Sequence, residues 1–171
     1  MRNRLPLLYD FFGGLAALFL LATLIIILVN ILGRQFGFFL RGADAYAGYS
    51  IAAVAFLALA STLKKGEHIR VTLIFQRLKG KSRKAMQVWC FAAGSLLSAY
   101  FSFFSWKMVW FSYSFHEISQ GQDATPLWIP QTAMALGLSV LTLALLEGLV
   151  TFLRGGTTEV AESRETVSYV E

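Results

Sequence analysis

The stretch 64–84, KKGEHIRVTLIFQRLKGKSRK, determines how the rest of the chain is interpreted. Eight of its 21 residues are Lys or Arg, and a long apolar run lies on each side of it. Short loops this rich in Lys and Arg stay on the cytoplasmic side of a membrane, because moving them across is unfavourable during insertion. The stretch therefore predicts a membrane protein whose central loop is cytoplasmic.

The composition also indicates an integral membrane protein. Hydrophobic side chains make up 56% of the 171 residues and the mean hydropathy is +0.59, which is too apolar for a soluble domain with a charged surface. Four windows are long enough to cross a hydrocarbon core of about 30 Å, and they cover residues 11–32, 43–63, 85–114 and 127–153. We therefore predict one all-α membrane domain of four transmembrane helices over 1–153, followed by a disordered cytoplasmic tail over 154–171.

The distribution of Lys and Arg predicts the orientation of these helices. Each terminal tail carries two arginines, the first connection carries Arg34 and Arg41, and the connection between His116 and Thr125 carries none. Both termini are therefore expected to be cytoplasmic, with the chain a multi-pass membrane protein. The net charge of +5 comes mainly from the central loop, so its expected counterpart is the anionic lipid of the inner leaflet, and no nucleic acid is needed.

Within the basic loop, residues 67–79 are predicted to form an amphipathic helix on the inner membrane surface. Its apolar positions follow the spacing i, i+3, i+4, i+7, and they are Val71, Ile74, Phe75 and Leu78. His68 lies on the opposite face and Arg70 flanks the stripe. Such a helix suits the membrane interface, although a short helix packed onto the protein's own bundle would show the same pattern.

Two of the windows carry faces of small residues at helical spacing. In the second window these are Ala45, Gly48, Ala52 and Ala55, and in the third they include Ser98, Ser102 and Ser105. Small residues let helix backbones approach closely in lipid, where ordinary hydrophobicity gives no drive to associate. The faces therefore predict packing seams, either within this chain or with another subunit.

Charged residues inside the windows are few. Asp44 begins the second window, Lys107 lies toward the same end of the third, and Glu147 lies toward the inner end of the fourth, where a basic residue is within reach. Because a charge at the bilayer centre costs at least about 3 kcal/mol, we expect each to be paired or close to an interface. Asp44 and Lys107 lie at similar depth and are predicted to form an ion pair, with simple snorkelling as the alternative.

Two motifs resemble those of a known family. The run LKKGEHIRV over 63–71, which follows a small-residue helix, is similar to the end of the second helix in the DctQ-like small membrane subunit of tripartite ATP-independent periplasmic (TRAP) transporters. The run TPLWIP over 125–130 resembles the start of the last helix in that family, where Pro126, Trp128 and Pro130 carry the motif. Taken by itself, Thr125-Pro126 also suits an N-cap followed by proline at the first helical position.

The resemblance implies a non-catalytic role in transport. In such systems a periplasmic binding protein captures an organic acid, and a large membrane subunit moves it inward by symport, usually with sodium. The small subunit anchors and supports the large one, which implies a stable heterodimer, a transient contact with the binding protein, and no cofactor. The sequence is compatible with this role, because it contains neither a mid-membrane carboxylate nor an inverted repeat that would indicate its own transport path.

Other classes of function remain as alternatives. A haem or other redox enzyme would need His pairs within helices or Cys pairs, whereas His68 and His116 lie at helix ends and Cys90 is the only cysteine. A small proton-coupled exporter would need an acidic residue deep in the first window, which has none. The principal alternative is a four-helix membrane enzyme, of transferase or redox type, that binds an anionic cofactor with the basic loop. No catalytic, cofactor-binding or metal-binding residue is predicted.

Overall fold

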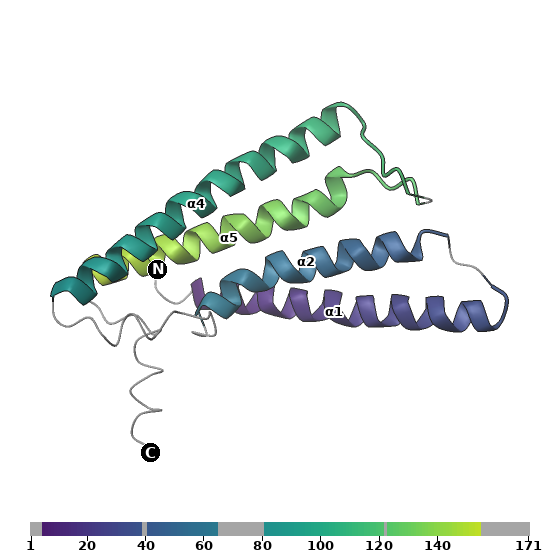
Figure 1. Cartoon of the computed structure of the whole chain (residues 1–171), viewed down its shortest axis with the longest axis horizontal. Coiled ribbons are helices and arrows are strands. Elements are labelled where there is room, and N and C mark those ends of the chain that lie inside the picture. The colour runs from purple at the N-terminus through teal and green to yellow at the C-terminus, as the bar shows by residue number, and fades with distance from the viewer. Residues whose placement is uncertain (1–4, 39–40, 65–80, 122, 155–171) are drawn as a thin grey trace, which may run out of the picture.

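The computed structural model of the chain describes residues 5–38, 41–64, 81–121 and 123–154 (Figure 1). Over these ranges it is helical apart from loops and one isolated β-bridge. The helices are α1 (Leu5–Gln35), α2 (Ala43–Lys64), α4 (Lys81–Ser114) and α5 (Trp128–Leu153). All four are long and apolar enough to cross a membrane, which confirms the prediction of an all-α chain with four such helices.

The helices extend beyond some of the predicted windows. α1 begins at Leu5 and ends at Gln35, and α4 begins at Lys81 rather than at residue 85. A window of apolar residues marks the part of a helix that suits hydrocarbon, whereas backbone hydrogen bonding can continue into the headgroup layer. The predicted interfacial helix over 67–79 and the tail beyond Arg154 lie outside the described residues. The former includes His68, Arg70, Val71, Ile74, Phe75 and Leu78.

The four helices form a row in the order α1, α2, α5, α4 (Figure 1). The main packing contacts are those of α1 with α2, α2 with α5, and α5 with α4, so α1 and α4 stand at the two ends of the row. The described residues of the two loops, 36–38 with 41–42 and 115–121 with 123–127, lie at the same end of the helices, which we call the loop end. A row leaves more helix surface uncovered than a closed bundle does.

Small side chains and close backbone contacts hold the middle of the row together. One buried cluster contains Ala16, Ala53 and Leu57, and contributes the contact between α1 and α2. Between α2 and α5, a Cβ added at Gly137 would lie only 2.3 Å from the carbonyl oxygen of Phe56. The α2–α5 crossing therefore requires glycine at position 137, because any side chain would collide with backbone.

Two described residues of the loop that joins α4 to α5 have unusual backbone conformations. His116 and Ala124 adopt left-handed conformations, with φ of 53° and 47°. Between them the Ser119 N–H donates to the Thr125 carbonyl at 2.8 Å. α5 begins only at Trp128, and its N-cap Leu127 makes no side-chain capping hydrogen bond. The predicted N-cap at Thr125 is therefore wrong, because the backbone of Thr125 is already bonded across the loop.

Candidate partner-binding faces

The serine face predicted on the third window forms the contact between α4 and α5. The hydroxyls of Ser98 and Thr142 lie 2.6 Å apart, and those of Ser102 and Ser139 lie 2.9 Å apart. Ser105 is buried and donates to the carbonyl of Phe101 in its own helix. The small hydroxyl side chains thus allow the two helices to approach closely and join them by hydrogen bonds. We call this contact the serine seam.

The small-residue face predicted on the second window does not coincide with the buried side of α2. The residues that α2 buries against its neighbours include Ala47, Ala53 and Leu57. The predicted face is one helical position away: Ala45 and Ala52 are half-buried, whereas Gly48 and Ala55 are exposed. A Cβ added at Gly48 would meet no atom within 4 Å. Of the predicted α2 residues, Gly48 and Ala55 are therefore left open on the surface of the row.

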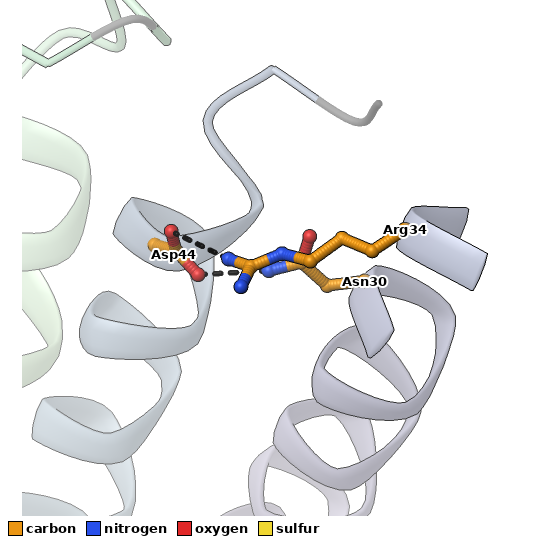
Figure 2. A network of polar contacts seen from close by, with 3 residues as sticks. All are labelled: Asn30, Arg34 and Asp44. Atoms are coloured by element: carbon orange, nitrogen blue, oxygen red, sulfur yellow. Dashed lines mark hydrogen bonds and ion pairs between the residues drawn. The ribbon is translucent and has the colours of Figure 1, made fainter. Parts of the chain in front are cut away.

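Asp44 finds its partners on α1 and not on α4 (Figure 2). The Arg34 guanidinium lies 3.9 Å from one carboxylate oxygen of Asp44, and the Asn30 amide donates to the other at 2.8 Å. The predicted ion pair with Lys107 is thus replaced by one with Arg34. The reason is the order of the row, since α5 lies between α2 and α4.

Lys107 lies on the exposed surface of α4 beside aromatic rings. Its ammonium is 6.0 Å from the ring centre of Phe104 and 5.7 Å from that of Phe111. These distances suit cation–π attraction, which the electron-rich face of an aromatic ring provides. Lys107 therefore keeps its charge on the lipid- or partner-facing side of the row.

Residues of α2 and the α4–α5 loop form a polar cluster at the loop end. The Tyr49 hydroxyl lies 2.8 Å from Ser119 Oγ and 3.2 Å from Asp123 Oδ2, and Ser119 also donates to Asp123 Oδ1 at 3.0 Å. Hydrogen bonds to the carboxylate lower the pKa of Asp123 below its usual value, and the bond from Thr125 has a larger effect than the bond from Ser119. The cluster fixes the loop above α2, where Gly42 leaves space for the Asp123 side chain.

At the end of the helices opposite the loop end, α1 is joined to α5. The Tyr9 hydroxyl donates to Glu147 Oε2 at 2.9 Å, and the Tyr9 side chain is only 1% exposed. Tyr9 also belongs to a buried cluster with Ala60 and Val140. The carboxylate of Glu147 thus accepts a hydrogen bond from a buried tyrosine, and the side chains of Lys64 and Lys84, two of the basic residues it was expected to reach, lie outside the described residues. Sequence reasoning missed this contact, and the only signal for it was that Tyr9, near the start of its helix, and Glu147, near the end of its helix, were both predicted at the inner side of the membrane.

The described residues contain no group of three or more His, Cys, Asp or Glu side chains placed to hold a metal ion. Several of their polar groups join helix to helix or fix the α4–α5 loop, and others, such as Ser105, bond to the backbone of their own helix. Such an arrangement provides packing surfaces and a fixed order of helices.

Comparison with protein families identifies the chain. The family model for the DctQ component of tripartite ATP-independent periplasmic transporters matches residues 23–155, which is more than three quarters of the chain. The chain belongs to this family. No curated protein and no solved structure matches it.

The match covers most of the features described above, but not Tyr9 and Ala16 in the first half of α1. It begins at Thr23, midway along α1, and includes all of α2, α4 and α5. The TPLWIP run lies inside it: Pro126 takes part in the β-bridge with Ile118, and Trp128 packs edge-to-face against Tyr113 with ring centres 5.8 Å apart. Pro130 lies in the first turn of α5, where a missing backbone N–H leaves no helical hydrogen bond unmade.

Proposed function

We propose that this DctQ component is the non-catalytic small membrane subunit of a TRAP-type secondary transporter for organic acids. It anchors and supports a large transport subunit, with which it forms a stable heterodimer. A periplasmic binding protein delivers the solute and docks transiently, and an ion gradient, of sodium in our proposal, drives symport. The observation that carries the proposal is the family match over residues 23–155.

The arrangement of the helices supports a scaffolding role. Each helix at the end of the row leaves most of its long apolar surface uncovered, and the side chains exposed on α1 and α4 include Leu24, Ile25, Leu28, Leu96, Phe103 and Trp110. Uncovered apolar surface suits lipid and partner helices equally. By contrast, several polar groups of the described residues form contacts between helices. These contacts support the row.

The proposal includes an orientation in the bacterial inner membrane. Both termini and the basic loop 64–84 are cytoplasmic and contact anionic lipid, and the loop end of the row is periplasmic. An interfacial helix over 67–79 would lie at the inner surface. The test is labelling of single cysteines in a Cys90→Ser background. A cysteine at Gly121 should react in intact cells, and one at Gly66 only after permeabilisation. The reverse pattern would contradict the orientation.

Purification and reconstitution test the function. The chain is co-expressed with a large TRAP transport subunit, and the two should purify together in a fixed ratio. Proteoliposomes that contain both subunits, with the binding protein and a sodium gradient, should take up an organic acid. Vesicles that contain this chain alone should take up none. Uptake by the chain alone, or full uptake by the large subunit alone, would refute the proposed division of roles.

A further inference from the structure

One hydrogen bond joins two helices that are not neighbours in the row. α2 stands between α1 and α5, yet the Tyr9 hydroxyl of α1 donates to Glu147 Oε2 of α5 at 2.9 Å. The Tyr9 ring packs with Ala60 of α2 and Val140 of α5 on the way. The bond therefore links the hairpin formed by α1 and α2 to the hairpin formed by α4 and α5, at the end opposite the loop end (Figure 1).

The packing of α2 against α5 provides a crossing about which the hairpins could rotate. The two helices approach closely at Phe56 and Gly137, and Ala133 packs against the cluster that contains Leu57. Such contacts depend on close fit and contain no directional bond. Glu147 lies ten residues beyond Gly137. That spacing is about 15 Å along a helix, so a rotation of about 10° at the crossing would displace Glu147 by about 3 Å and break the bond.

The surroundings of the two groups make the loss of this bond unfavourable. The Tyr9 side chain is 1% exposed, Glu147 is half-buried, and both lie in helices apolar enough to cross a membrane. In hydrocarbon no water replaces a hydrogen bond that is lost, so a hydroxyl or carboxylate without a partner is costly. A rotation that separates Tyr9 from Glu147 is therefore opposed at both ends of the bond.

The contacts between the hairpins at the loop end are of another kind. Tyr49 contacts Ser119 and Asp123, and Thr125 donates to the Tyr46 hydroxyl. These bonds run from α2 to the α4–α5 loop and not to a second helix. Because a loop yields more readily than a helix, they restrain the angle between the helices less directly than the bond of Tyr9 with Glu147 does.

We infer that Tyr9 and Glu147 form a latch that fixes the angle between the two hairpins at the end opposite the loop end. With the latch intact, α1 and α4 keep a constant spacing at that end, although they stand at the two ends of the row. Without it, the hairpins rotate about the α2–α5 crossing. The inference concerns this chain by itself and goes beyond the proposed function.

Distances between spin labels test the latch. The full chain, in lipid nanodiscs and in a Cys90→Ser background, carries labels at Leu7 near the start of α1 and at Trp89 near the start of α4, which are 72% and 69% exposed. Tyr9→Phe keeps the ring in its buried cluster but removes the donor. The distribution of distances between the labels should broaden by about 3 Å, which is the displacement expected for a small rotation.

Substitution of the acceptor provides a rescue. Glu147→Gln keeps an oxygen that can accept the bond and should keep the narrow distribution, whereas Glu147→Leu should broaden it as Tyr9→Phe does. The matched control is Tyr100→Phe, which removes a hydroxyl from an exposed tyrosine of α4 and should change nothing. Labels at Leu32 and Trp110, toward the loop end of α1 and α4, should report the same distances in every variant, because the contacts there remain.

Two results would overturn the inference. One is an unchanged distribution for the labels at Leu7 and Trp89 in Tyr9→Phe. The other is equal broadening of both label pairs, since that would mean a general loosening of the chain and not the loss of a local latch. If Tyr9→Phe does not fold, the comparison of Glu147→Leu with Glu147→Gln decides, and equal distributions in these two variants would count against the latch.

Discussion

The two hairpins of the row are held together by different interactions. Along α4–α5, hydroxyl pairs such as Ser98–Thr142 form side-chain hydrogen bonds at successive levels. Along α1–α2, the contact is made by small apolar groups such as Ala16 and Ala53, and polar contacts with Asp44 occur at the loop end. Hydrogen bonds fix the register and rotation of two helices, whereas apolar contacts in lipid depend on close fit alone. The α4–α5 hairpin is therefore expected to be the more rigid half.

Substitution of Gly137, at the contact between the two hairpins, should cause the largest loss in the free energy of unfolding. In Gly137→Ala the new Cβ would lie 2.3 Å from the Phe56 carbonyl oxygen, so α2 and α5 must move apart. We expect a loss of about 3 kcal/mol in the free energy of unfolding, measured by titration with a denaturing detergent. Gly48→Ala is the matched control, because its Cβ meets no atom and helix propensity should make the change neutral or stabilising by about 0.5–1 kcal/mol. Equal effects at the two positions would contradict the close α2–α5 contact.

Substitutions in the serine seam should have the second largest effect on the free energy of unfolding. Ser98→Ala removes one partner of the hydroxyl pair with Thr142 and should lower the free energy of unfolding by about 1 kcal/mol, in line with polar contacts between membrane helices. A double-mutant cycle with Thr142→Val should give a coupling energy of about 0.6 kcal/mol or more. Ser114→Ala, at an exposed position near the end of α4, should have no measurable effect. If the cycle shows no coupling, the hydrogen bond does not hold the seam.

The ion pair of the other hairpin should contribute less. The side chains of Arg34 and Asp44 are 63% and 83% exposed, so their coupling in a double-mutant cycle should be about 0.5 kcal/mol. The cycle of Asp44 with Lys107 should give zero within about 0.3 kcal/mol, since the two residues share no contact. A larger coupling with Lys107 than with Arg34 would reverse the assignment drawn in Figure 2.

The smallest effect should be a pH dependence at the loop end. Hydrogen bonds from Thr125, Ser119 and Tyr49 lower the pKa of Asp123 below 3.8 in the folded chain. Their contribution to stability is thus complete above the unfolded pKa and is lost as the pH falls through the folded one. The α4–α5 loop should therefore become easier to cleave with protease below about pH 4. Asp123→Asn should abolish this change, and an unchanged pH profile in that variant would assign it to another group.

The number and approximate limits of the helices could be predicted because apolar length is a local property of the sequence. The position of Asp44 in the first turn of α2 was predictable for the same reason, but its partner was not. The choice between Arg34 and Lys107 depends on which helices are lateral neighbours, and hydropathy contains no information on that order. The serine seam followed from helical spacing, whereas the α2 face was displaced by one position because two neighbours, α1 and α5, together determine which side α2 buries.

The row of helices also affects the lipids around the chain. Four helices in a line have a longer perimeter in the plane of the bilayer than four in a square, so more acyl chains are held against the protein. When a partner covers one edge, those acyl chains return to the bulk bilayer and regain their conformational freedom, and this gain favours association. A chain with so few polar groups can in this way contribute to assembly through the lipid that it releases.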